Sequence, residues 1–297
     1  MSSKPRIPMT LFAFRRLSPG IVLLALACTA TTPSFAGINN DVPSCYAANK
    51  MTAKKPQLDR EIFVVIDQTT VFDDKLKRSI SENLWDNLLP NTAFTVVRFS
   101  AFSQGRYTDV VTTGVIEPPL PDAMRDDTST KLMGKFDSCM QAQLKFARDH
   151  AIKAVNASLS DATTDLAKSD ILAALKDVSA RVKASPAKDK LVFLASDMLE
   201  NSSVSSFYAA GNRVRKVEAS KELALIEKAG LMADFGGSVA VHVIGAGLLA
   251  QQGPGAKLNY RDAATMSALN EFWLRYFEKS GARLVQFGAP ALLQPVR

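Results

Sequence analysis

The sequence predicts a doubly wound α/β fold in which a mainly parallel six-stranded sheet is covered by helices on both faces. Runs rich in valine, isoleucine, leucine and phenylalanine alternate along the chain with segments whose apolar residues recur every three or four positions. This alternation is typical of parallel strands joined by crossover helices. One pair of runs, residues 92–101 and 108–117, is joined by a short link that contains Gly105, so we expect an antiparallel pair at one edge.

The six expected strands are short and strongly apolar, as strands covered on both faces are. They span residues 61–67, 92–101, 108–117, 191–197, 238–245 and 283–287. The first and the fourth end in acids, Asp67 and Asp197. Because ligands of doubly wound sheets bind beyond the carboxyl ends of the strands, these two acids mark the edge where a site is expected.

Amphipathic helices are expected between the strands. They span about residues 73–89, 137–159, 169–185, 215–233 and 262–280. Asp73 or Asp74 is suited to cap the first helix and Asp262 the last, and Gly281 is suited to end the last one. The helix at 137–159 belongs to a helical insertion near residues 120–165, within a domain that spans residues 61–297.

Composition and charge limit the classes of function. With 47% hydrophobic and 22% charged residues in 297, the chain is an ordinary globular protein. Two histidines and three cysteines exclude multi-histidine metal centres and zinc modules with four cysteine ligands. The net charge is +7, but the first 36 residues hold four basic residues and no acid. The remaining chain has 32 basic and 29 acidic residues, so a nucleic-acid partner is not expected.

The first 36 residues have the pattern of a signal peptide. Basic residues precede the apolar run at 21–27, and Ser34-Phe35-Ala36 resembles a signal-peptidase site. The run is shorter than a membrane span, which needs about 20 apolar residues. We therefore expect a mature, exported chain that begins near Gly37 in the periplasm, with an irregular leader over residues 37–60. The alternative is a lipoprotein anchored through Cys28.

Removal of the signal peptide would leave two cysteines, Cys45 and Cys139. An even number of cysteines in an oxidising compartment favours a disulfide bond between them. The alternative is two buried, unpaired thiols.

The order of elements resembles the von Willebrand factor type A domain over about residues 61–290. The family motif D-x-S-x-S corresponds to residues 67–71, Asp-Gln-Thr-Thr-Val, in which Asp67 and Thr69 match the first two ligands. Val71 stands at the second serine and has no side-chain oxygen. Ser169 matches the family's threonine, and Asp197 its late aspartate. The resemblance implies strand order 3-2-1-4-5-6 with an antiparallel edge strand, and a metal-ion-dependent adhesion site.

The candidate metal ligands are therefore Asp67, Thr69, Ser169 and Asp197, with Thr70 as a further candidate in place of Val71. Carboxylate and hydroxyl oxygens suit Mg²⁺, and Mn²⁺ and Ca²⁺ are alternatives. Each residue also has a purely structural interpretation. The acids and Ser169 are suited to cap helices, and the threonines to form turns.

Three functions fit these features. The first is an exported module that binds a protein partner in an envelope complex, and it is favoured by paired acids at strand ends without a catalytic histidine or cysteine. The second is a metal-assisted hydrolase that uses the same carboxylates. The third is a metal-free scaffold subunit of an envelope or secretion assembly. We favour the binding module and expect no enzymatic activity.

A glycine-rich segment after the fifth strand imitates a dinucleotide-binding motif. Gly245, Gly247 and Ala250 fit G-x-G-x-x-G/A, but Pro254 interrupts the helix whose N-terminus would bind the pyrophosphate. We expect no nucleotide cofactor.

Overall fold

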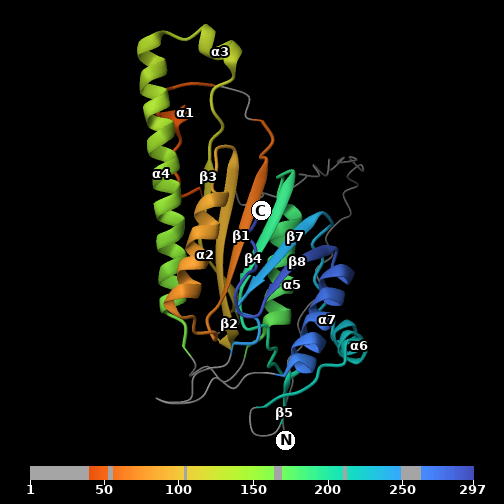
Figure 1. Cartoon of the computed structure of the whole chain (residues 1–297). Coiled ribbons are helices and arrows are strands. Elements are labelled where there is room, and N and C mark those ends of the chain that lie inside the picture. Colours follow the sequence, from red (N-terminus) through yellow and green to blue (C-terminus); the bar gives the residue numbers. More distant parts are fainter. Residues whose placement is uncertain (1–39, 53–55, 104–105, 164–168, 210–212, 249–261) are drawn as a thin grey trace, which may run out of the picture. The chain divides into compact units, whose positions relative to one another are not determined.

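A six-stranded sheet forms the centre of the fold, in the order β3-β2-β1-β4-β7-β8 (Figure 1). Neighbouring strands are parallel except β2 and β3, which pair antiparallel at one edge. This arrangement confirms the predicted doubly wound sheet and its antiparallel edge pair. The strands of this sheet span Arg60–Asp67 (β1), Thr92–Ser103 (β2), Arg106–Ile116 (β3), Asp189–Ala195 (β4), Val239–Ile244 (β7) and Ala282–Gly288 (β8).

The computed structural model describes residues 40–52, 56–103, 106–163, 169–209, 213–248 and 262–297. The expected signal peptide, the alternative lipid anchor at Cys28 and the segment at 249–261 lie outside the described residues. Within the described part of the chain, none of the helices combines the length and apolar character that crossing a bilayer requires.

The helices form two layers, one on each face of the sheet (Figure 1). They span Cys45–Ala48 (α1), Asp74–Asn87 (α2), Asp122–Asp126 (α3), Thr130–Ser160 (α4), Ile171–Ala184 (α5), Ala219–Lys228 (α6) and Ala263–Lys279 (α7). Alternate residues of β1 pack against the two helix layers, because successive side chains of a strand point to opposite faces. Val64 packs with α2 and α4, whereas Val65 packs with α5, α6 and α7.

Two helix ends agree closely with the sequence pattern. Asp73 caps α2 by accepting the Leu76 N–H at 2.8 Å, and Asp262 caps α7 by accepting the Thr265 N–H at 2.9 Å. Gly281 follows α7 with φ of +75°, a left-handed conformation that glycine adopts without steric cost. The carboxylates therefore satisfy helix N–H groups that lack a partner within the helix.

Other element boundaries differ from the prediction. Helix α4 begins seven residues before the expected position, because Met133 and Phe136 are buried against Tyr46 rather than lying in a loop. Helix α6 is shorter than expected at both ends. Before it lies a small antiparallel hairpin, β5 (Tyr208–Ala209) with β6 (Arg213–Val214), just ahead of the expected helix start and where no strand is expected from the sequence.

The segment before β1, which was expected to be irregular, holds the short helix α1 and is fixed to the domain. A disulfide bond links Cys45 to Cys139 in α4, as predicted. The buried Glu117 carboxylate accepts hydrogen bonds from Ser44 Oγ at 2.6 Å and from the Cys45 N–H at 2.7 Å. These contacts hold the segment against β3 and α4.

Candidate functional site

The carboxyl ends of β1 and β4 bring two polar loops together. The parallel register pairs Ile66 with Ala195, so the next residues, Asp67 and Ser196, lie side by side at the edge of the sheet. Ser196 Oγ donates a hydrogen bond of 2.8 Å to Asp67 Oδ2. The site therefore forms where parallel strands end next to each other, as expected for this fold class.

Four donors surround the Asp67 carboxylate. Oδ1 accepts hydrogen bonds from the Thr69 N–H at 2.9 Å and from Thr69 Oγ1 at 2.6 Å. Oδ2 accepts from Ser196 Oγ at 2.8 Å and from Ser169 Oγ at 3.3 Å. Asp67, Thr69 and Ser169, three of the residues singled out in the sequence, thus meet around one carboxylate, although Ser169 is 102 residues from Asp67.

Burial dominates the electrostatics of Asp67. Its exposed fraction is 0%, and burial raises the pKa of the carboxyl group because a charge is disfavoured away from water. Hydrogen bonds from Thr69 and Ser196 act in the opposite direction and lower the pKa. Among the described residues no basic side chain forms an ion pair with Asp67. The carboxylate is therefore held by neutral donors alone.

Asp197 joins this group through its backbone. Its N–H donates a hydrogen bond of 3.1 Å to Oγ1 of the buried Thr70, while its own Oδ1 accepts the Leu199 N–H at 2.8 Å. The Thr70 side chain therefore spans the gap between the β1 and β4 loops. Asp197 is half-buried, and its backbone carbonyl accepts the Gly247 N–H at 2.8 Å.

Ser169 does not cap α5, the structural alternative considered for it. The N-cap of that helix is Asp170. Ser169 instead forms an isolated antiparallel bridge with Asn201, with N···O distances of 3.3 and 3.0 Å. Because both backbone groups of Ser169 are engaged by the loop after β4, its hydroxyl is free to turn toward Asp67.

Val71 and Ser196 are the two departures from the expected ligand pattern. Val71 is 49% exposed and supplies no oxygen. Ser196 is completely buried, and the sequence analysis missed it. A signal was present, since Ser196 follows the fourth strand at the position that a parallel register sets beside the end of the first strand.

Glu200, in the loop after β4, is a second buried polar residue that sequence reasoning missed. It is completely buried, and its Oε2 accepts the Leu172 N–H at the start of α5 at 3.0 Å. Its Oε1 is buried without a hydrogen-bond partner among the described residues. Burial raises the pKa of Glu200 to about 8, so the carboxyl group carries a proton in most molecules at pH 7.

The loop after β4 is fixed from the opposite side by α7. Met198 has φ of +61°, a left-handed conformation that is uncommon for a residue with a side chain. Its carbonyl accepts a hydrogen bond of 2.9 Å from Nε1 of the buried Trp273. This bond and the Met198 N–H to Ser196 Oγ contact at 3.0 Å hold the loop in the conformation that presents Ser196 to Asp67.

The donor set of the site consists of oxygen atoms only. Within the described residues there is no group of three or more His, Cys, Asp or Glu side chains that could hold a metal ion. A cation at this edge would therefore depend on the hydroxyl groups of Thr69 and Ser169 in addition to carboxylates. Oxygen ligands of this kind suit hard cations such as Mg²⁺ rather than zinc or copper.

Comparisons with known proteins reveal only distant likenesses. No protein-family model matches the chain, and no curated protein matches its sequence. Similar solved structures include an aerotolerance-related membrane protein from Bacteroides fragilis, with 16% identity, coverage of 75% of this chain and 90% of that one, and a TM-score of 0.33. The conserved hypothetical protein BatB from Bacteroides thetaiotaomicron has 13% identity, coverage of 77% and 90%, and a TM-score of 0.34. The TFIIH p34 N-terminal domain has 10% identity, coverage of 72% and 96%, and a TM-score of 0.26. At these values no function is transferred to this chain.

Proposed function

We propose that the protein is a protein-binding module whose binding face is the carboxyl edge of the sheet around Asp67. The observation that supports this proposal is the meeting of Thr69 and Ser169, from two separate loops, at one buried carboxylate. A divalent cation, Mg²⁺ or alternatively Mn²⁺ or Ca²⁺, would be held by Asp67, Thr69, Ser169 and Asp197. Thr70 would support the site through its contact with the Asp197 backbone.

The chemistry of the residues fits such a cation. Mg²⁺ takes oxygen ligands in octahedral geometry and usually keeps several waters. The two carboxylates and two hydroxyls leave positions that an acidic side chain of a partner would fill. A cation would also compensate the charge of Asp67, whose burial disfavours ionisation. The missing oxygen at Val71 would make the site weaker, because one ligand is replaced by water.

We also propose that the protein works outside the cytoplasm, in a complex of the bacterial envelope. The Cys45–Cys139 disulfide supports this location, since disulfides persist in oxidising compartments. The basic and apolar start of the sequence supports export to the periplasm, with anchoring through Cys28 as the alternative.

Binding is favoured over hydrolysis by where the two histidines lie. His150 contacts Thr112, and His242 contacts Gln286 in the sheet. Neither contact belongs to the group around Asp67, so no histidine is available there as a general base.

A second candidate, a metal-free scaffold, is favoured by a different observation. Asp67 and Asp197 both accept local backbone N–H groups, from Thr69 and Leu199. Carboxylates that are satisfied in this way stabilise loops without a cation. In that case the same edge would bind a partner through its shape and hydrogen bonds alone.

Thermal unfolding with and without divalent cations separates the two candidates. Mg²⁺ or Mn²⁺ added to EDTA-treated protein should raise Tm, because a ligand that binds only the native state stabilises it. Asp197→Ala should abolish the shift. The matched control Asp126→Asn, which removes an exposed carboxylate from α3, should keep it. An unchanged Tm in the unmodified protein at millimolar cation would contradict the cation site and favour the metal-free scaffold.

A further inference from the structure

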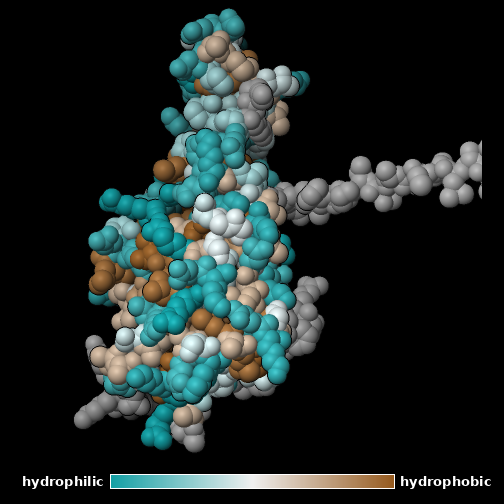
Figure 2. All heavy atoms as spheres, turned by 90° about the vertical axis from the view of Figure 1, so that its right-hand side faces the viewer, coloured by the Kyte–Doolittle hydropathy of each residue, from teal (hydrophilic) through white to brown (hydrophobic). Residues whose placement is uncertain are grey.

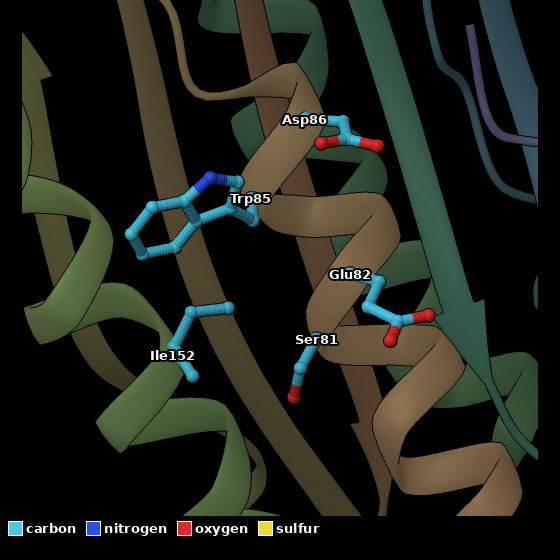
Figure 3. Close-up of a pocket in the computed structure, with 5 residues that line it drawn as sticks. All are labelled: Ser81, Glu82, Trp85, Asp86 and Ile152. Atoms are coloured by element: carbon cyan, nitrogen blue, oxygen red, sulfur yellow. The ribbon is translucent and has the colours of Figure 1, made fainter.

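A shallow groove lies between α2 and α4, along a face of the molecule that the site around Asp67 does not use. Its volume is about 350 Å³. Its lining residues are Ser81, Glu82, Trp85, Asp86 and Ile152 (Figure 3). Figure 3 shows the indole of Trp85 beside Ile152 of α4, with both carboxylates on the opposite side of α2. Helix α2 thus separates an apolar wall, formed by Trp85 and Ile152, from an acidic wall, formed by the carboxylates of Glu82 and Asp86.

The apolar wall is preorganised. Trp85 is 39% exposed, yet the Arg148 guanidinium lies 4.9 Å from its ring centroid. Arg148 is itself held by a 3.0 Å hydrogen bond from its Nε to the Leu88 carbonyl at the end of α2. Ser81 Oγ also donates to Asn156 Oδ1 of α4 at 3.1 Å. A ring that is fixed before binding loses little conformational entropy when a partner packs on it.

The acidic wall lacks a compensating charge. Glu82 and Asp86 are one helical turn apart, and like charges at this spacing repel each other. Neither forms an ion pair with another described residue. Arg78 lies one helical turn before Glu82 without forming an ion pair with it, and Arg148 is engaged by Trp85 and by the Leu88 carbonyl. A cation placed between Glu82 and Asp86 would remove the repulsion and gain two attractive contacts.

Exposed apolar residues elsewhere are not organised in this way. Leu225 of α6 and Leu274 of α7 are 42% and 47% exposed. On the face shown in Figure 2, apolar residues lie in small groups between hydrophilic ones. Scattered exposed leucines are normal for a soluble surface. An exposed tryptophan beside two unpaired acids is a more specific feature, since tryptophan is enriched among the residues that dominate protein interfaces.

We propose that this groove binds a basic segment of a partner protein. A lysine or arginine of the partner pairs with Glu82 and Asp86, and a neighbouring apolar side chain packs on Trp85 and Ile152. Because basic residues outnumber acidic ones after the first 36 residues, 32 to 29, a basic segment is attracted to this local acidic wall and not to the surface in general. The groove is a second docking surface, independent of the cation site at the sheet edge.

Tryptophan fluorescence and calorimetry with a defined probe test this proposal. The probe is a synthetic amphipathic peptide of lysine and leucine, compared with a counterpart in which glutamate replaces lysine. The chain has two tryptophans, and Trp273 is completely buried, so an emission change reports Trp85. The lysine peptide should change the emission saturably, and the glutamate peptide should not. Binding should weaken with added salt, because exposed charge pairs are screened.

Matched variants locate the binding by calorimetry. The double variant Glu82→Gln with Asp86→Asn should weaken binding roughly three- to tenfold. Trp85→Ala should weaken it at least about tenfold, and Trp85→Phe should have a smaller effect if the alanine variant is poorly folded. The control pair Asp126→Asn with Asp127→Asn removes the same charge from exposed positions and should bind normally. Equal affinity of the two double variants would overturn the proposal. Self-association of the protein would also overturn it, if sedimentation detects the association and Trp85→Ala abolishes it. The occupant of the groove would then be a second copy of this chain.

Discussion

Ser196 Oγ lies 2.8 Å from Asp67 Oδ2 and donates a hydrogen bond to it, although the two residues are 129 positions apart in the chain. Both side chains are completely buried. The contact follows from the parallel pairing of β1 with β4, which sets the first residue after β4 beside the last residue of β1. It ties the two loops that make up the candidate site.

Ser196→Ala should destabilise the protein by about 1–2 kcal/mol, because Asp67 then loses a donor and the Met198 N–H loses an acceptor in a buried region. Urea unfolding of the variant measures the change. Ser203→Ala, at an exposed serine of the same loop, serves as the comparison. If Ser196→Ala costs no more than Ser203→Ala, the contact with Asp67 is not important for the loop.

Glu200→Gln should change how stability depends on pH. Burial raises the pKa of Glu200 from 4.5 to about 8, so between these values the native state binds a proton that the unfolded state releases. Stability of the unmodified protein therefore falls as pH rises from about 4.5 to 8, by up to ~1.4 kcal/mol per pH unit. Glutamine cannot ionise, so the variant should lose this slope and be more stable at pH 8.

Urea unfolding at several pH values measures the Glu200 effect. The control is Glu271→Gln, at an exposed carboxylate that pairs with Arg275, and it should keep the slope. A Glu200→Gln variant with the same slope as the unmodified protein would show that Glu200 is ionised in the folded state at neutral pH.

His242→Gln should act in the opposite direction, at lower pH. Burial, followed by the charges of Arg283 and Arg60, lowers the pKa of His242 from 6.5 to about 4. Below pH 6.5 the unfolded state binds a proton that the native state excludes, so stability falls as pH decreases from 6.5 to 4, by on the order of 3 kcal/mol in total. The glutamine variant should lose this acid sensitivity in urea unfolding, whereas His150→Gln, at a half-exposed histidine, should retain it.

Removing the disulfide with Cys45→Ala and Cys139→Ala should lower the free energy of unfolding by about 2–5 kcal/mol. The bond closes a loop with a sequence separation of 94, which restricts the unfolded chain. Guanidinium unfolding of the oxidised protein and the double variant measures the loss, and non-reducing peptide mapping verifies the link. Free thiols at both positions in protein isolated from an oxidising compartment would contradict the bond.

The sheet was the most predictable part of the fold. The apolar run at 61–67 and the fourth run as far as Ala195 are buried strands, and the order of all six strands agrees with the prediction. Such strands can be recognised in the sequence because a strand covered on both faces must be apolar at nearly every position. The hairpin β5–β6 was missed because its strands have only two residues each and carry no periodic signal.

The early start of α4 was missed for a different reason. The residues at 130–136 have little amphipathic pattern of their own, and Phe136 is buried by α1 and Tyr46 from a segment far away in the sequence.

The disulfide was predictable from the number of cysteines, since an even number of cysteines and an oxidising compartment can be inferred without knowledge of the fold.

The sequence by itself determined the six strands of the central sheet and the helix caps at Asp73 and Asp262, because these depend on local patterns. The sheet order and three residues of the group around Asp67 followed from the resemblance of its motif to a known family. Only the tertiary structure decided that Ser196 completes the group and that Ser169 serves it instead of capping α5. Both outcomes come from the parallel register and from the Ser169–Asn201 bridge. Hydrogen bonds between residues more than a hundred positions apart depend on how strands pair, and strand pairing minimises the free energy of the whole sheet rather than of any one segment.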